Sequence, residues 1–132
     1  MFMKNFINLK KMRLSLLHAF SGIFKTVLLE QNFRFHLIFI ILVLITGFYL
    51  GISSLEWGFV ILSIFFVLVS ELFNTALERL CDRYGGGKKS KKIAIIKDIS
   101  AGAVLLAALN AVIIGVIFLL IPLVKKLFWP SQ

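Results

Sequence analysis

Long apolar segments separated by short polar ones dominate the pattern of the chain. The 19 residues between His36 and Glu56 carry no charge, which suffices for one membrane-spanning helix of about 20 residues. A further 26 uncharged residues lie between Asp98 and Lys125. Only 14 lie between Glu56 and Glu71, so a second span must include Glu71 near its end. We therefore predict membrane-spanning helices at about 37–53, 56–82 and 93–121.

The segment before the first span has a helical rather than a continuous apolar pattern. Apolar side chains recur there every three or four residues, and most polar ones fall between them, which is typical of an amphipathic helix. We expect this helix over about residues 6–30, lying on the inner surface of the membrane. The apolar positions are Leu9, Met12, Leu16, Phe20, Ile23 and Val27.

Composition supports a single membrane domain. The chain has 132 residues, of which 60% are hydrophobic, and a soluble fold of this size could not cover so much apolar surface. The single cysteine, Cys81, excludes an intrachain disulfide. We predict an all-α membrane protein in which residues 1–132 form one domain.

The positive charges are distributed unevenly between the predicted loops. Of the 15 Lys and Arg residues, six precede the first span and seven fall from Arg79 to Lys97, around the connection between the second and third spans. Because such residues concentrate in cytoplasmic loops, we expect a cytoplasmic N-terminus and a C-terminus outside. The aromatic residues sit in spans rather than among the exposed cations, so we expect no nucleic-acid partner despite the net charge of +9.

Four polar residues mark one face at the end of the second span. Glu71, Asn74, Glu78 and Asp82 fall within a stripe of about 80° on a helix. Carboxylates suit Mg²⁺, and nearby lysines suit phosphates, so these residue types fit phosphoryl transfer. The alternative is that the acids only pair with interfacial cations, Asp82 with Arg79 or Arg83 and Glu30 with Arg34. Charge alone favours this alternative.

The segment that contains Glu71 resembles the signature of a known family. ELFNTALERLCD (71–82) is similar to the prokaryotic diacylglycerol kinase motif, which is Glu, two residues, Asn, Ser or Thr, Ala, an aliphatic residue, Glu, and Asp four residues further on. Three more segments agree in order, and together they cover roughly residues 9–121. They are LHAFSGI (17–23), LEQNFRFH (29–36) and IKDISAGAVLLAA (96–108).

The resemblance implies a fold, a reaction and an assembly. Members are homotrimers in the bacterial cell (inner) membrane, with three spans, a surface helix and active sites shared between subunits. They transfer the γ-phosphoryl group of ATP to a lipid alcohol. By this match Glu71 would be the catalytic base, and Glu30 and Glu78 would hold Mg²⁺. Glu71, Asn74 and Arg34 would contact the lipid acceptor.

The resemblance also implies a set of nucleotide contacts. The early basic position of the surface helix aligns with Lys11, although Arg13 suits it by chemistry. The aligned nucleotide-binding residues are Lys11, His18, Glu30, Glu78, Lys97 and Asp98.

Two departures leave the acceptor open. His36 stands where the best-studied branch has a second Glu, and His at this place is familiar from the undecaprenol kinase branch. The basic segment GGGKKSKK (85–92) replaces an acidic and aromatic linker, so no contact is carried over to it. Diacylglycerol, the family default, is the expected acceptor and would give phosphatidic acid, and undecaprenol, which would give undecaprenyl phosphate, is the alternative. A helical scaffold or transporter subunit without activity is the other class, and it predicts that Glu71→Gln is tolerated. We expect Asn110 to form an interhelical hydrogen bond rather than an acceptor pocket.

Overall fold

The computed structural model describes residues 8–84 and 90–129, and everything described there is helix or short connection. The predicted all-α class is therefore confirmed for these ranges. The elements are α1 (Leu9–Leu29), α2 (Gln31–Leu50), α3 (Ser54–Tyr84), α4 (Lys91–Gly115), the π-helical turn η1 (Val116–Leu120) and α5 (Ile121–Phe128).

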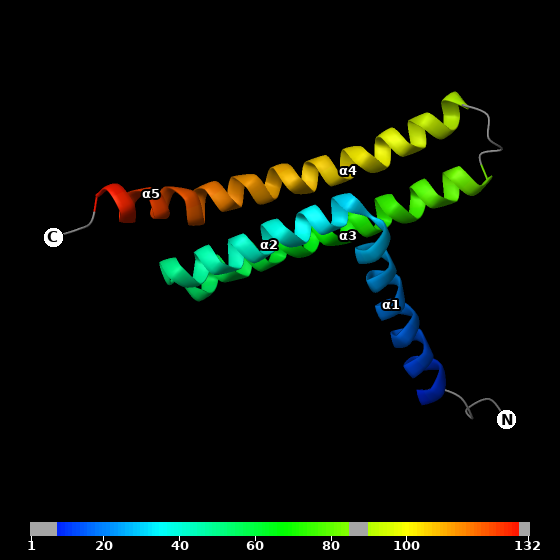
Figure 1. Ribbon diagram of the computed structural model, residues 1–132, viewed down its shortest axis with the longest axis horizontal. Coiled ribbons are helices and arrows are strands. Elements are labelled where there is room, and N and C mark those ends of the chain that lie inside the picture. Colours follow the sequence, from blue (N-terminus) through cyan, green and yellow to red (C-terminus); the bar gives the residue numbers. More distant parts are fainter. Residues whose placement is uncertain (1–7, 85–89, 130–132) are drawn as a thin grey trace.

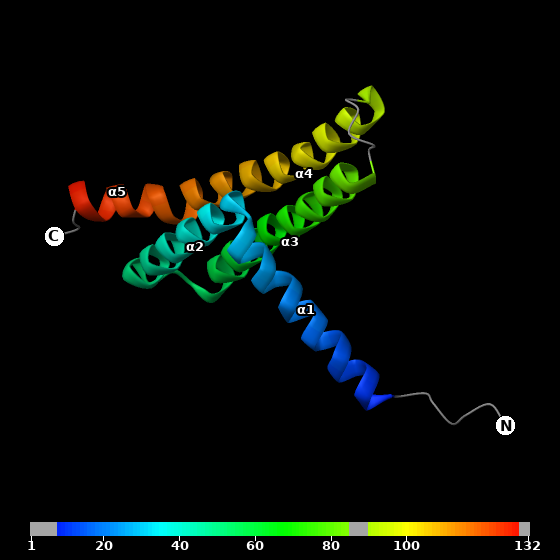
Figure 2. The same cartoon turned by 45° about the vertical axis from the view of Figure 1, so that its right-hand side comes forward.

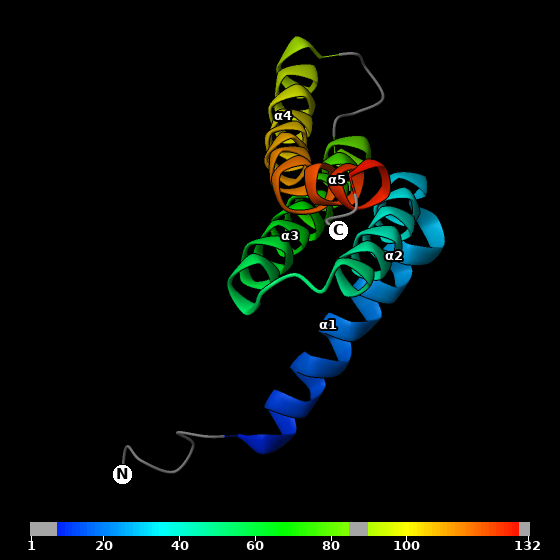
Figure 3. The same ribbon diagram turned by 90° about the vertical axis from the view of Figure 1, so that its left-hand side faces the viewer.

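Helices α2, α3 and α4 lie side by side, and α1 diverges from them. Helices α2 and α4 both pack along α3, and α4 follows it for most of its length (Figures 1 and 2). Helix α1 meets the others only at its C-terminal end and runs off in a different direction (Figure 3). The junction between α1 and α2 is Glu30, whose extended backbone (φ −107°, ψ 119°) turns the chain.

The connection between α2 and α3 is specified locally. Gly51 ends α2 in the left-handed region at φ 66°, which glycine adopts without steric cost. The next helix starts with a capping box: the Ser53 N–H donates to Glu56 Oε2 at 2.6 Å, and the Glu56 N–H donates to Ser53 Oγ at 3.3 Å. Next to this turn, Trp57 of α3 packs directly on Gly47 of α2.

The last helix widens before Pro122. Proline has no N–H to donate, and its ring would clash with the carbonyl four residues earlier. The π-helical turn Val116–Leu120 relieves this conflict, so the chain continues as α5 instead of stopping. Lys126 of α5 then donates to the Tyr49 carbonyl at 3.0 Å and lies 4.2 Å from the centre of the Tyr49 ring.

The helices differ from the predicted spans mainly at their ends. Helix α2 begins at Gln31 instead of about 37, and α5 extends the third helical rod to Phe128 instead of about 121. The predictions followed the charges, which mark where a segment meets water. A helix can continue through such a boundary because its backbone bonds are internal.

The apolar surface is far larger than the core. Few apolar side chains are buried, notably Phe33, Val60, Val67 and Leu119, whereas most leucines, isoleucines and phenylalanines are exposed. Four helices in the described part of the chain are long and apolar enough to cross a membrane, α1 among them. Both facts indicate a membrane protein, because a bilayer can cover what the fold leaves exposed.

Candidate active site

Helix α3 carries the polar residues that the fold buries. Glu71 is 3% exposed, and Asn74 and Thr75 are 6% exposed. They share the face of α3 that also buries Val60 and Val67. Burial of these polar groups is costly unless other polar groups meet them. The predicted stripe is therefore turned into the protein at Glu71 and Asn74, not outward toward lipid.

Asn74 joins two helices through its side chain. Its Nδ2 donates to Glu78 Oε1 at 3.2 Å, one turn further along α3. Its Oδ1 accepts from Ser100 Oγ of α4 at 2.7 Å. The Ser100 hydroxyl is also within 2.9 Å of the Lys97 carbonyl. These contacts fix the position of the Glu78 carboxylate relative to α4.

Glu30 is bound to α3 through Arg79, which follows Glu78 in that helix. Its Oε1 accepts from Arg79 Nη2 at 2.7 Å and from Arg79 Nε at 3.3 Å. Arg34, which the sequence offered as the alternative partner, instead donates from Nη1 to the Leu28 carbonyl at 2.9 Å. The bend between α1 and α2 thereby places Glu30 against α3.

Glu71 lies among these groups without a hydrogen-bonded partner in the described residues. Glu78 and Glu30 are near enough for their negative charges to act on the Glu71 carboxyl. No three His, Cys, Asp or Glu residues in the described part of the chain are placed to share one metal ion. Among the described residues, Glu30 and Glu78 thus have their carboxylates held by Arg79 and Asn74, whereas Glu71 has no hydrogen-bond donor.

The residues predicted to bind nucleotide are only partly brought together. Lys97 of α4 pairs with Asp82 of α3 at 2.5 Å, so Asp82 pairs with neither Arg79 nor Arg83. Asp98 is exposed on α4. Lys11 and His18 are exposed on α1, and the start of α1 is directed away from the bundle (Figure 3). Residues 85–89 of the GGGKKSKK segment lie outside the described residues.

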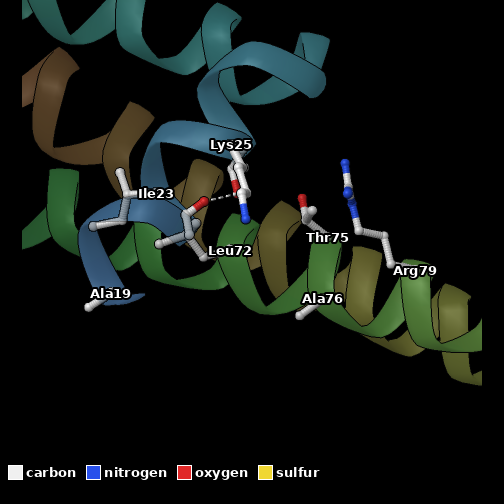
Figure 4. A pocket seen from close by; sticks show the side chains of 9 residues that line it. Ala19, Ile23, Lys25, Leu72, Thr75, Ala76 and Arg79 are labelled. Atoms are coloured by element: carbon white, nitrogen blue, oxygen red, sulfur yellow. Dashed lines mark hydrogen bonds between the residues drawn. The ribbon is translucent and has the colours of Figure 1, made fainter. Parts of the chain in front are cut away.

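A groove of about 510 Å³ separates α1 from α3 next to this cluster. Its floor is formed by small and apolar side chains, and Lys25 and Arg79 add positive charge to it. Figure 4 shows Lys25 projecting from α1, with Thr75 and Arg79 projecting from α3. The lining residues are Ala19, Gly22, Ile23, Lys25, Thr26, Leu72, Thr75, Ala76 and Arg79.

A second groove lies between α3 and α4 and leads to Asn74. Two adjoining hollows, of about 350 and 670 Å³, share Phe66, Ser70 and Ala103 in their lining. The smaller one reaches Asn74 and Ser100, and the larger one is otherwise mostly apolar. At its far end Asn110 Nδ2 donates to Ser63 Oγ at 3.1 Å, which confirms the expected interhelical hydrogen bond.

Sequence reasoning missed three members of this cluster. Ser100 was not singled out within the segment 96–108, although a serine three residues after Lys97 shares its helical face. Arg79 was considered a partner for Asp82, but not for Glu30. Thr75 is buried next to Asn74, and only its place within the signature segment marked it.

Comparison with known proteins identifies the family of this chain. Residues 17–119 match the family model described as prokaryotic diacylglycerol kinase. An undecaprenol kinase from Bacillus subtilis is 38% identical over 106 residues, which are 80% of this chain and 85% of that protein. A diacylglycerol kinase from Synechocystis sp. is 35% identical over 108 residues, which are 82% of this chain and 62% of that longer protein.

The match extends over most of the chain and includes the buried stripe, Glu30, Lys97 and Asp98, whereas Lys11 precedes its first residue. The chain therefore belongs to the prokaryotic diacylglycerol kinase family and is a lipid kinase.

Proposed function

We propose that this chain transfers the γ-phosphoryl group of ATP to the hydroxyl of a membrane lipid alcohol, with Glu71 as the base. The observation that carries this proposal is the state of Glu71. It is buried on α3, is close enough to Glu30 and Glu78 for their charges to act on it, and has no hydrogen-bond donor on its carboxylate among the described residues. A carboxylate in that state is available to accept the proton of a substrate hydroxyl.

The reaction assigns one task to each carboxylate. Glu71 takes the proton from the lipid hydroxyl while the hydroxyl oxygen forms a bond to the γ-phosphorus. The bond from that phosphorus to the β–γ bridging oxygen breaks, and ADP leaves with the electron pair. Glu30 and Glu78 would hold Mg²⁺, which when bound neutralises charge on the phosphate oxygens.

The donor set fits such an ion. Mg²⁺ in phosphoryl-transfer sites is held by one or two carboxylates and completed by phosphate oxygens and water. Two carboxylates without a third protein ligand are what Glu30 and Glu78 supply. The Asn74 amide holds Glu78 in position by its 3.2 Å hydrogen bond, so this carboxylate is oriented before any ligand arrives.

The long α3 helix relates the site to the membrane. Its 31 residues extend about 46 Å, whereas the hydrocarbon core is about 30 Å thick. Glu78 lies about 10 Å further along this helix than Glu71. In this proposal the lipid hydroxyl approaches Glu71 from the bilayer and the nucleotide approaches Glu78 from the water side. The α3/α4 groove, which reaches Asn74 one turn from Glu71, would take the lipid chain.

Undecaprenol is the acceptor that we place first, and diacylglycerol is the second candidate. The sequence alone favoured diacylglycerol as the family default. Two observations support placing undecaprenol first. A histidine at the position of His36 is typical of the undecaprenol kinase branch, and the relative named undecaprenol kinase is matched over 85% of its length. The relative named diacylglycerol kinase is matched over 62% of its length.

We further propose that α1 lies on the cytoplasmic surface of the inner membrane and that the chain forms a homotrimer with shared sites. The direction of α1, which departs from that of α2–α4 (Figure 1), supports the surface placement. The separation of Lys11 and His18 from the carboxylates supports sharing, because nucleotide contacts missing within one chain can come from a neighbour.

A two-lipid assay tests the activity. Purified protein in mixed micelles receives radiolabelled ATP and either undecaprenol or diacylglycerol, and the labelled lipid is measured. We expect product with at least one lipid and more with undecaprenol. Labelled product from neither would contradict the proposal.

The base is tested by Glu71→Gln, with Glu56→Gln as the matched control. Both variants remove one carboxylate from α3, but Glu56 caps its opposite end. We expect Glu71→Gln to lower kcat by roughly 10²–10⁴-fold while helical circular dichroism and oligomeric state are unchanged. Retained activity in Glu71→Gln would contradict the role of Glu71 as the base, whereas a scaffold would show no activity in the unaltered chain either.

A further inference from the structure

Glu30 already has a cation on one of its two carboxylate oxygens. Arg79 donates two hydrogen bonds, from Nη2 at 2.7 Å and from Nε at 3.3 Å, and both go to Oε1 of Glu30. In this state the proposed metal ligand is neutralised from within the chain. Arg79 also draws the junction of α1 and α2 onto α3, because Glu30 is the residue at that junction.

A guanidinium and a divalent ion compete for such a carboxylate. Both are attracted by the same negative charge, and two positive charges within a few ångströms of each other repel. A divalent ion that binds Glu30, at Oε1 or at the other oxygen, therefore weakens the hold of Arg79 on this carboxylate.

The position of Arg79 makes that release feasible. Its side chain is 53% exposed, and that of Glu30 is 29% exposed, so solvent screens the pair and the pair is weak. Arg79 also lines the open α1/α3 groove, and the other cation there, Lys25, projects from α1 (Figure 4). The side chain can leave Glu30 without entering a packed core.

We propose that Arg79 is an exchangeable counter-ion of Glu30. It keeps this carboxylate in place while no divalent ion is bound, and the ion displaces it on binding. Arg79 is thus a positioning residue rather than a catalytic one. The proposal rests on the proposed function, since it takes Glu30 as a metal ligand.

The exchange predicts that loss of Arg79 strengthens metal binding. Mn²⁺ is titrated into the detergent-solubilised full chain without nucleotide, and bound ion is measured by electron paramagnetic resonance. We expect Arg79→Gln to raise the apparent Mn²⁺ affinity by roughly two- to five-fold, the size of an exposed ion pair. Arg79→Lys should fall between Arg79→Gln and the unaltered chain, because an ammonium cannot repeat the guanidinium fork.

Two further variants separate this mechanism from general charge effects. Arg83→Gln removes the same charge one turn further along α3, where the side chain is exposed, and should change the affinity much less. In a Glu30→Gln background, Arg79→Gln should have no effect beyond that of Arg83→Gln. Equal or lower Mn²⁺ affinity in Arg79→Gln than in Arg83→Gln would overturn the exchange and leave Arg79 as a structural tie.

The metal assignment has its own control. Glu30→Gln in the otherwise unaltered chain should weaken Mn²⁺ binding. If it does not, Glu30 is no metal ligand, and the metal site of the proposed function fails together with the exchange. If Glu30→Gln weakens binding but Arg79→Gln does not strengthen it, only the exchange fails.

Discussion

At the scale of single residues, the site depends on polar groups that meet across helices. Asn74 uses both ends of its amide, donating to Glu78 and accepting from Ser100. The Ser100 contact is buried and joins α3 to α4. An unmade hydrogen bond in such a place costs more than a made one contributes, because the remaining group is left without water or partner. Ser100 therefore has an influence that its size does not suggest.

We predict that Ser100→Ala destabilises the protein by about 1–3 kcal/mol, since it leaves Asn74 Oδ1 without its donor. Unfolding by sodium dodecyl sulfate, followed by circular dichroism, measures this change. Ser70→Ala is the matched control, because the Ser70 hydroxyl bonds only to carbonyls of its own helix, Phe66 at 2.8 Å and Val67 at 3.0 Å. A loss of stability no larger in Ser100→Ala than in Ser70→Ala would show that the interhelical bond contributes little.

At the scale of elements, the close contact between α2 and α3 depends on a glycine, Gly47, which has no side chain. Trp57 packs against Gly47 so tightly that a Cβ there would lie 2.8 Å from Trp57 Cη2 and 3.0 Å from Cζ2. The indole is also paired with the Phe48 ring at 4.8 Å. It therefore fixes how α2 and α3 meet at the end of the bundle that lies opposite the candidate site. Small residues serve membrane helices in this way by letting neighbouring groups approach.

We predict that Gly47→Ala costs about 1–3 kcal/mol, the usual effect of overpacking a filled contact. Gly58→Ala is the control on α3, where an added Cβ meets nothing within 4 Å and alanine favours the helix. Thermal unfolding in detergent compares the two variants. Adding Trp57→Leu to Gly47→Ala should recover much of the lost stability. If Gly47→Ala and Gly58→Ala unfold at the same temperature, the contact between Gly47 and Trp57 does not limit stability.

At the scale of the whole molecule, the exposed apolar surface and the charge distribution place the chain in a bilayer. Helices α2, α3 and α4 run side by side, whereas α1 diverges from them (Figure 1). Four helices in the described ranges satisfy the length and composition of a span. Composition therefore does not separate three spans with a surface helix from four spans. The direction of α1 favours three, and with three spans 13 of the 15 Lys and Arg residues would fall on one side, as is typical of cytoplasmic loops.

Cysteine labelling tests this topology. In a Cys81→Ser background, single cysteines replace Lys10, Ser54 or Tyr84, and a membrane-impermeant maleimide is applied to intact cells. We predict that Ser54→Cys reacts from outside, whereas Lys10→Cys and Tyr84→Cys react only after permeabilisation. Outside labelling of Lys10→Cys together with inside labelling of Tyr84→Cys would mean that α1 crosses the bilayer as a fourth span.

Much of the fold could be predicted because helix formation in apolar segments is local. The spans were located by counting uncharged residues, and the errors lie at Gln31 and Phe128, where helices continue beyond the charged boundary. Glu71, Asn74 and Glu78 were identified by their resemblance to the family signature and by their shared helical face. An interhelical hydrogen bond of Asn110 was predicted, but its partner, Ser63, was not.

The sequence by itself determined that the chain forms apolar helices and where an acidic stripe lies on one of them. Only the tertiary structure decided that Arg79 pairs with Glu30, that Lys97 pairs with Asp82, and that Glu71 has no donor among the described residues. The physical reason is that periodicity and capping depend on neighbours within a turn or two. Which of several similar cations pairs with a given carboxylate depends instead on which helices pack together and on how far they are shifted along one another.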